Sequence, residues 1–581
     1  MAGQVQEPVT YRPPGATAKQ GSATTEDPIT TEVIRHGLNA AADQMQLALC
    51  RTAFSPIIYE ILDLCCALYD RDVRLLAQGK SLPSWLGTMN FSIEAIVKAV
   101  GGPETLEEGD VLFSTYGYDL GSHPQDAVTV LPIFFEGELV GYAAVKAHQM
   151  DIGAKDLYCS DTTDNFQEGA IFPGVRLYRK GELQEDLWRS LIANSRMPKA
   201  LAGDVHASIA SAEVGARSVR QLLERYGTEL FFSCVERMFD HGEATVRRFL
   251  EEIPDGRYVA RGALDSNGIT TDSIDFEITI DVQGSEILVD FSDAPPQQRG
   301  PVNAPQPVAV SCARYTMMFL AGGGSRDYIN EGHLRPIAVR TRPGTMFHPL
   351  PPAPLFLYNH PSRQACDAII RAMADALPGQ VTADSGGCIC SALFWGTKED
   401  GTLWGTGIDH AVGQGATLAA DGGGPLMHIA VSGIRSTPVE VAEARFPLVV
   451  RKFELAQDSS GAGQHRGGLG LDVEYELLED VYCTAIIERT KREPLGLFGG
   501  DSARANRMGV RDPEGGELAI TKVTALPIVK GSIFQVRTGG GGGYGPAAER
   551  SPEQVARDVR EGFISEEQAR ADYPHAFGAK A

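Results

Sequence analysis

The stretch that most constrains the fold lies at residues 128–146, where two apolar runs are separated by the dipeptide Glu136-Gly137. Two such runs around a short, glycine-containing dipeptide are typical of a β-hairpin. A two-residue turn at this dipeptide pairs Phe135 with Glu138. Because side chains alternate between the two faces of a strand, that one pairing determines which residues face each other along the whole hairpin.

Three side chains with metal-binding atoms gather at the open end of this hairpin. In the predicted register His148 lies opposite Gln125, between His123 and Asp126 of the facing segment. A metal ion needs imidazole nitrogens and carboxylate oxygens that converge within about 2.0–2.2 Å of it. The spacing therefore predicts a metal site. A His and an Asp three residues apart also form simple hydrogen-bonded loops, and spacing alone leaves that alternative open.

Asp63 is the natural fourth ligand. It lies in the otherwise apolar hairpin pattern at residues 61–77, where a carboxylate is costly unless it is paired or bound to a metal. Two imidazoles with two carboxylates suit Zn²⁺, Mn²⁺ or Fe²⁺ better than Ca²⁺ or a soft metal, and we expect zinc. Asp151 either orients a ligand imidazole through a hydrogen bond or is simply exposed.

The rest of the chain mixes helix and strand patterns without a repeating strand–helix unit, which predicts a multi-domain α+β fold. A third hairpin is expected around residues 283–284, and long helices at 30–52, 201–226, 230–253 and 362–377. We predict four parts: a flexible tail at 1–27, a metal-site α+β domain at 28–260, a glycine-rich second α+β domain at 261–548, and a C-terminal helical tail at 549–581.

Glycines cluster late in the chain, at residues 422–424, 465–470 and 539–543. The 465–470 segment offers backbone N–H groups of the kind that bind phosphate, but we interpret it as a structural loop. The 539–543 run is interpreted as a tight turn that precedes two short helices. Their starts are indicated by capping-box patterns at residues 551–554 and 565–568.

Composition excludes several classes of partner. The 581 residues carry a formal net charge of −23, and an acidic chain repels nucleic acid and anionic membranes. No apolar run approaches the ~20 residues of a membrane span. The segment from Met1 to Asp27 has no basic start followed by an apolar stretch, so we expect no signal peptide and a cytoplasmic location. The ten cysteines are expected to be buried free thiols.

Several stretches resemble the hydantoinase B/oxoprolinase family, which includes β subunits of N-methylhydantoinase and caprolactamase and is related to subunits of acetone and acetophenone carboxylases. The resemblance runs from about residue 28 to the end of the chain. The matching stretches are Asp63 to Asp70, Gly121 to Asp126, Ala147 to Gly153, Phe166 to Gly169, Arg299 to Pro305, and the glycine-rich end with its two helices.

This resemblance implies the four metal ligands Asp63, His123, Asp126 and His148. It also implies a larger hydantoinase A-type partner that binds ATP and Mg²⁺, because this chain has neither a phosphate-binding Gly-x4-Gly-Lys-Ser/Thr loop nor a dinucleotide fingerprint at a strand–helix junction. We expect two copies of each subunit. Relatives often have a second His where this chain has Gln149, and many differ around residues 359–361, so the substrate is not specified.

The function predicted from the residues and the resemblance together is ATP-dependent ring opening of a lactam, hydantoin or oxoproline-like cyclic amide by metal-activated water. Two alternatives stay open. One is a subunit of an ATP-dependent ketone carboxylase, in which the metal stabilises an enolate. The other is a non-catalytic scaffold subunit with a structural metal, which a closed set of four protein ligands would favour.

Overall fold

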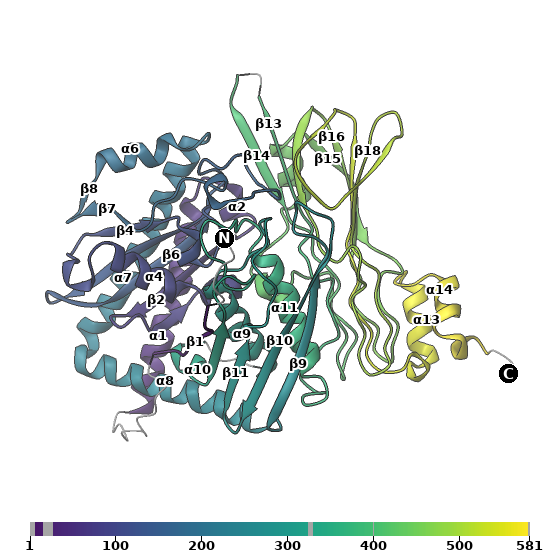
Figure 1. Cartoon of the computed structure of the whole chain (residues 1–581), viewed down its shortest axis with the longest axis horizontal. Helices are drawn as coiled ribbons and strands as arrows, with labels where there is room; N and C mark the ends of the chain where they lie inside the picture. The colour runs from purple at the N-terminus through teal and green to yellow at the C-terminus, as the bar shows by residue number, and fades with distance from the viewer. Residues whose placement is uncertain (1–5, 15–26, 323–328, 399, 579–581) are drawn as a thin grey trace. The chain divides into compact units, whose positions relative to one another are not determined.

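The computed structural model describes residues 6–14, 27–322, 329–398 and 400–578, and it divides into two compact units (Figure 1). Unit 1 comprises residues 1–157, 162–259 and 277–362, and unit 2 comprises residues 158–161, 260–276 and 363–581. Both units mix helices with sheets, as predicted for an α+β chain. The division differs from the expected domains, because residues 277–362 belong to the first unit and the C-terminal helices belong to the second.

The larger sheet of unit 1 has seven antiparallel strands in the order β3-β2-β6-β5-β4-β7-β8. The strands are β2 (Leu64–Asp70), β3 (Leu75–Gln78), β4 (Val111–Ser114), β5 (Asp126–Phe135), β6 (Glu138–His148), β7 (Val175–Arg179) and β8 (Glu182–Leu183). The predicted hairpins at 61–77 and 128–146 are therefore confirmed. Strand β2 is buried along its whole length, because helices and loops cover both faces of the sheet.

Helices cover this sheet. Those that begin in unit 1 are α1 (Pro28–Thr52), α2 (Pro56–Tyr59), α3 (Pro83–Leu86), α4 (Met89–Ala99), α5 (Gly117–Leu120), α6 (Glu185–Ala193), α7 (Pro198–Tyr226), α8 (Thr228–Glu251), α9 (Gln306–Leu320), α10 (Glu331–Leu334) and α11 (Asn359–Ala372). The helices predicted at 30–52, 201–226 and 230–253 are α1, α7 and α8. The helix predicted at 362–377 is α11, which begins three residues earlier and ends five residues earlier.

The two faces of the sheet have different neighbours. Helices α1 and α7 pack against each other and contact strands of one face (Figure 1). On that face the Cys66 Sγ lies 3.6 Å from the Ser211 Oγ of α7. On the opposite face, Lys146 of β6 donates to the backbone oxygen of Leu120 in α5 at 2.8 Å. His148 lies two residues beyond Lys146 in the same strand, so it projects from this second face.

The hairpin of β5 and β6 contains a bulge that the sequence pattern does not reveal. Glu136 and Gly137 form the two-residue turn, and both have positive φ, as a twisted hairpin turn requires. Phe135 pairs with Glu138, as predicted, but the register then shifts by one because Val140 is an extra residue in β6. From the bulge to the open end every pair is displaced by one position.

The predicted register at the open end is therefore wrong by one residue. His148 pairs with Asp126, not with Gln125. Residues directly opposite each other on antiparallel strands project from the same face, and a one-residue slip exchanges the faces. The bulge thus places Asp126 and His148 on the same face of the sheet.

A second, five-stranded sheet has the order β1-β12-β11-β10-β9. Its strands are β1 (Val9–Tyr11), β9 (Gly256–Leu264), β10 (Ile274–Gln283), β11 (Glu286–Asp290) and β12 (Ile337–Thr341), and β10 with β11 forms the third predicted hairpin. Strand β1 corrects part of the expected flexible tail, because Val9–Tyr11 pairs with β12. Residues 1–5 and 15–26 of that expected tail lie outside the described residues.

Unit 2 contains two antiparallel sheets, ordered β14-β13-β17-β20 and β15-β16-β21-β18-β19. Their strands are β13 (Ser391–Thr397), β14 (Leu403–Ile408), β15 (Leu448–Leu455), β16 (Leu471–Leu477), β17 (Val481–Ile486), β18 (Arg507–Arg511), β19 (Glu517–Ile520), β20 (Lys522–Ile528) and β21 (Ile533–Arg537). The helices are α12 (Val439–Arg445), α13 (Pro552–Arg560) and α14 (Glu566–Asp572). The last two lie side by side near the C-terminus (Figure 1).

The glycine run at 539–543 is not the predicted tight turn, since all five of these described residues have φ outside the left-handed region. The run lies among the segments 413–416, 461–468 and 497–501, to which it is hydrogen-bonded through the backbone. A Cβ on Gly541 would lie 1.9 Å from the carbonyl oxygen of Gln414. Glycine is required here because neighbouring backbones approach too closely to leave room for any side chain.

The 465–470 segment belongs to the same array and is a structural loop, as interpreted. The backbone N–H groups of Gly467 and Gly468 donate to the carbonyl oxygens of Gly461 and Gln414 at 3.0 and 2.8 Å. These donors are therefore committed to the backbone. The capping box predicted at Ser551 is present, and Ser565 caps α14 by accepting a hydrogen bond from the backbone of Gln568.

Two further expectations from composition can be compared with the structure. The ten cysteines are free thiols, and all but the half-buried Cys50 are buried. Among the described residues, no helix combines the length and the apolar character needed to cross a membrane.

The close backbone packing predicts that Gly541→Ala destabilises the protein by about 3 kcal/mol or more, because the added methyl group forces hydrogen-bonded backbones apart. Thermal and denaturant unfolding would measure the loss. The matched control is Gly379→Ala: a Cβ at Gly379 meets no heavy atom within 4 Å, and we expect a change of no more than about 1 kcal/mol. Equal stability of the two variants would contradict the steric explanation.

Candidate metal centre

Four segments of unit 1 supply the predicted ligands. Asp126 is the first residue of β5, and His148 is the last residue of β6. His123 comes from the loop between α5 and β5. Asp63 immediately precedes β2, in contrast to its expected place within a strand, and its carbonyl oxygen accepts a 3.1 Å hydrogen bond from the backbone N–H of His148. Backbone pairing at this end of the strands β2, β6 and β5 thus brings Asp63, His148 and Asp126 close together.

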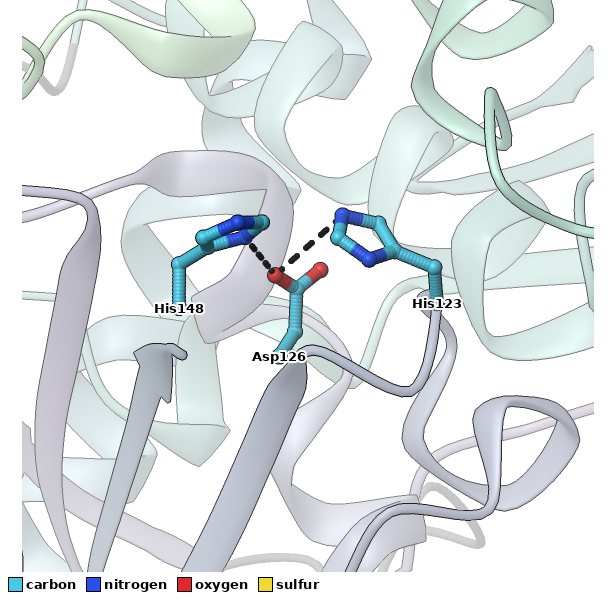
Figure 2. A group of neighbouring side chains, drawn as sticks. All are labelled: His123, Asp126 and His148. Atoms are coloured by element: carbon cyan, nitrogen blue, oxygen red, sulfur yellow. Dashed lines mark hydrogen bonds and ion pairs between the residues drawn. The ribbon is translucent and has the colours of Figure 1, made fainter. Parts of the chain in front are cut away.

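The side chains of His123, Asp126 and His148 converge, and Figure 2 shows the Asp126 carboxylate between the two imidazoles. The Asp126 Oδ1 lies 2.9 Å from the His148 Nδ1 and 3.3 Å from the His123 Nε2. Asp63 is more peripheral, with its Oδ2 3.8 Å from the His148 Nδ1. Ligand atoms around a tetrahedral ion are about 3.3–3.5 Å apart, so these separations fit the ligands of one ion after small adjustments.

Burial differs across the four residues. His123, Asp126 and His148 have side chains that are 4%, 0% and 3% exposed, whereas the Asp63 side chain is 17% exposed. A buried carboxylate between imidazoles is costly unless it is paired or bound to a cation. Three of the four side chains are therefore almost cut off from solvent, and Asp63 is the most exposed of the set.

Two groups of the cluster, His123 and Asp126, are in the protonation states that bind a metal. Burial lowers the pKa of His123 to about 4, so its imidazole is neutral near pH 7. Burial alone would raise the pKa of Asp126, but the adjacent imidazoles, His123 first, lower it overall and keep the carboxylate anionic. Neutral imidazoles and an ionised carboxylate are the forms that donate electron pairs to a metal.

Hydrogen bonds orient the first imidazole. The His123 Nδ1 lies 2.8 Å from the Gln125 Oε1, which can only accept a hydrogen bond. The proton of a neutral His123 therefore resides on Nδ1, and the Nε2 lone pair faces Asp126. Metal-bound histidines characteristically donate their other ring N–H to such an oxygen. On this test the residues fit a divalent ion.

Several neighbours of the cluster were not predicted from the sequence. Tyr358 donates its hydroxyl to the Asp126 Oδ2 at 2.9 Å, and burial raises the pKa of Tyr358, so the hydroxyl keeps its proton. The Phe356 ring stacks on the His123 imidazole, with centroids 4.8 Å apart. Lys146 is fully buried two residues before His148, and burial lowers its pKa to about 8. A lysine within the apolar run of β6 was the one sequence signal available for these residues.

Asp151 lies elsewhere in the network. It is buried, and its Oδ1 accepts a hydrogen bond from the Arg196 Nη2 at 2.6 Å, while its carboxylate also accepts from the backbone N–H of Gly153. These contacts hold the segment that leads into α7. Asp151 is expected from the sequence either to orient a ligand imidazole or to be exposed. It instead contacts Arg196 and Gly153, and the residue is buried.

A second group of metal-ligand residue types, Cys366, Asp367 and His428, lies in unit 2. Here the His428 Nδ1 accepts a hydrogen bond from the backbone N–H of Ala430 at 3.1 Å. The ring proton must then be on Nε2, which faces the Asp367 Oδ1 at 3.1 Å. The other Asp367 oxygen lies 3.0 Å from the Arg489 Nη2. This tautomer has no lone pair aimed at a metal, so the group is an ion-pair network.

The contrast between the two groups predicts different responses to metal. His123→Ala or His148→Ala should abolish the rise in melting temperature that Zn²⁺ produces in the unsubstituted protein, because a ligand stabilises only the state that binds it. His428→Gln, which can still donate to Asp367, should retain the full rise. Differential scanning fluorimetry with bound-metal analysis measures both effects. Loss of metal in the His428 variant alone would place the site in unit 2.

Comparisons with known proteins are consistent with this architecture. The model of the hydantoinase B/oxoprolinase family matches residues 27–547. A protein of Pseudomonas sp. (strain NS671), provisionally named as the B subunit of a D-/L-hydantoinase, is 30% identical over 563 residues, which cover 94% of this chain and 95% of that protein.

Two solved structures are similar along most of this chain. The crystal structure of an ATP-dependent caprolactamase from Pseudomonas jessenii has a TM-score of 0.88 and 27% identity, covering 95% of this chain and 96% of that one. A nucleotide-free acetone carboxylase structure has a TM-score of 0.84, covering 94% and 79% of the two chains, but at 19% identity it shows the fold alone. Because the family model spans most of the sequence, the chain belongs to the hydantoinase B/oxoprolinase family.

Proposed function

We propose that this chain is the metal-carrying subunit of an ATP-dependent hydrolase that opens a cyclic amide. The observation that carries the proposal is the convergence of His123, Asp126 and His148, with Asp63 beside them, in a chain of this family. The relatives named above include a hydantoinase component and an ATP-dependent caprolactamase, and both names denote enzymes that act on cyclic amides.

A divalent metal, zinc by our expectation, with Mn²⁺ or Fe²⁺ also compatible, would supply a Lewis acid and lower the pKa of a bound water to about 7. The chain's own residues set the conditions for that chemistry. Gln125 fixes the tautomer of His123, and burial keeps bulk water away from His123, Asp126 and His148. Asp63, the most exposed of the four, marks the side from which a substrate can approach.

Two glutamines lie next to metal-ligand candidates in the chain, and each has one buried atom that is unpaired among the described residues. Within the described structure, the Gln125 Nε2 and the Gln149 Oε1 are buried atoms without a hydrogen-bond partner. Such atoms are uncommon in folded proteins and are costly to leave unpaired. One is a donor and the other an acceptor, and each belongs to a residue next to a metal-ligand candidate in the chain, so both are candidate contacts to a polar substrate.

The proposal assigns ATP and Mg²⁺ to a larger hydantoinase A-type partner. Unstrained amides hydrolyse slowly, and phosphoryl transfer to the amide oxygen makes the carbon electrophilic and provides a leaving group. The similar caprolactamase is described as ATP-dependent, and the name of the similar hydantoinase protein denotes one component of an enzyme with several subunits. An assembly with two copies of each subunit is expected, since two-fold symmetry is the commonest closed arrangement.

The test is to purify this chain alone and together with the partner, and to assay both with ATP and a panel of lactams, hydantoins, 5-oxoproline and ketones. We expect ring-opened acid together with ADP and phosphate from the complex, and no turnover by the chain alone. Product mass spectrometry and ADP release measure the two sides of the reaction. Bicarbonate-dependent carboxylation of a ketone would instead establish the carboxylase alternative.

Variants separate catalysis from folding in that assay. His123→Ala in the complex should lower ring opening by at least about 100-fold, because the metal site loses a ligand. His465→Ala is the matched control; its side chain is 19% exposed in the glycine-rich part of unit 2, and we expect activity close to that of the unsubstituted protein. Full ring opening by a His123 variant that carries no metal would show that the metal is structural, as in the scaffold alternative.

A further inference from the structure

Two of the motifs that resemble the family are not explained by the four ligands. They contain Glu168 and Asn303, which are both fully buried. The structure brings both to one segment of unit 1, residues 352–358, which we term the strap. The strap supplies Phe356 and Tyr358 to the metal cluster. The question is what these two motifs hold in place.

Glu168 is hydrogen-bonded to the backbone in the middle of the strap. Its carboxylate accepts hydrogen bonds from the backbone N–H of Leu355, at 2.7 and 2.9 Å to its two oxygens, and from that of Phe356 at 2.8 Å. A further hydrogen bond from the Thr162 hydroxyl, at 2.7 Å, completes its surroundings. Burial raises the pKa of Glu168, whereas these three donors favour the ionised form because each stabilises the carboxylate. Hydrogen bonds to a buried carboxylate are stronger and more directional than those between neutral groups.

Asn303 and Tyr118 hold the strap immediately before this point. The Asn303 Nδ2 donates to the carbonyl oxygen of Pro354 at 2.9 Å, and the Tyr118 hydroxyl donates to that of Ala353 at 2.5 Å. Successive backbone groups of the strap are thus bound by side chains from different parts of unit 1. Such extensive bonding determines where the next side chains, Phe356 and Tyr358, must lie.

Tyr358 completes the connection to the metal cluster. Its hydroxyl accepts a hydrogen bond from the Trp85 Nε1 at 2.5 Å and donates to the Asp126 Oδ2 at 2.9 Å. The other oxygen, Oδ1, is the one that faces both imidazoles. The Tyr358 hydroxyl therefore distinguishes the two oxygens of the carboxylate, because it occupies Oδ2 and leaves Oδ1 to the imidazoles.

We propose that Tyr358 is a positioning residue that commits Asp126 to bind metal through a single oxygen, and that Glu168 and Asn303 position Tyr358 by fixing the strap. This inference deepens the proposed function and rests on the metal site described there. It adds a role for residues that lie outside the ligand set and gives the Phe166 to Gly169 and Arg299 to Pro305 motifs a shared purpose.

The experiment uses the full chain, stripped of metal with a chelator and titrated with Co²⁺ against a competing chelator. For Tyr358→Phe we expect Co²⁺ affinity to fall about 10- to 100-fold, the range typical when a partner of a metal ligand is removed. The visible Co²⁺ absorption should also change, because both oxygens of Asp126 become available. Tyr475→Phe is the control: it removes a buried hydroxyl in unit 2 that lies 2.9 Å from the His410 Nε2, and it should change neither readout.

Inclusion of His123→Ala separates failure of this inference from failure of the proposed function. If His123→Ala loses Co²⁺ while Tyr358→Phe keeps the affinity and spectrum of the unsubstituted protein, the metal site stands and the role of Tyr358 is refuted. If His123→Ala binds Co²⁺ as tightly as the unsubstituted protein, the metal site itself is wrong and the inference falls with it.

Glu168→Gln tests the strap independently of Tyr358. An amide nitrogen at the Oε2 position turns its N–H toward the N–H of Leu355, and the remaining amide oxygen is a weaker acceptor than a carboxylate oxygen. Glu168→Gln therefore weakens the hold on the strap at nearly unchanged side-chain volume. We expect the same direction of change in Co²⁺ affinity and spectrum as for Tyr358→Phe. The control is Glu331→Gln, a buried carboxylate of unit 1 that accepts a backbone hydrogen bond from Leu75 outside the strap. If Glu168→Gln lowers Co²⁺ affinity no more than Glu331→Gln does, the role of Glu168 is refuted.

Discussion

The burial of one carboxylate governs the arrangement of unit 1. Asp126 has no exposed surface, and an ion in such a place must be compensated by its neighbours. Two imidazoles face one of its oxygens, and Tyr358 donates to the other. The hairpin, the loop that carries His123 and the segment that carries Tyr358 all converge on this carboxylate. The imidazoles and the Tyr358 hydroxyl partly offset the buried negative charge of Asp126. A bound metal ion would offset it further.

The two groups of metal-ligand residue types show why residue identity alone does not define a site. His123 and His428 are both buried beside a carboxylate, yet their Nδ1 atoms meet opposite partners: an amide oxygen in one case and a backbone N–H in the other. The first arrangement directs a lone pair toward the carboxylate, and the second directs a proton there. The hydrogen-bond partner of Nδ1 therefore distinguishes the two groups. An acceptor there is compatible with a metal centre, and a donor there favours an ion-pair network.

Local pattern predicts the hairpins, the long helices and the gathering of His123 and His148 around Asp126, because apolar periodicity and turn residues are local properties. It did not predict the extra residue at Val140, which looks like any other apolar residue of a strand. Nor did it predict Tyr358, which is separated from Asp126 by 232 positions in the chain. The pattern of glycines at 539–543 suggests a tight turn, whereas the structure shows close backbone packing. Glycine permits both, and only the neighbouring segments distinguish the two.

Because of the bulge at Val140, the number of residues between Asp126 and His148 decides whether their side chains lie on the same face of the sheet. Asp126 and His148 share a face only because β6 contains one residue more than β5 over the paired region. Removal of a single residue between them would restore regular pairing but carry one of these side chains through the sheet toward α7. Substitutions along the hairpin do not change the number of residues, so they do not move either side chain to the other face. The alignment of Asp126 with His148 therefore constrains the number of residues in the hairpin, in addition to their identity.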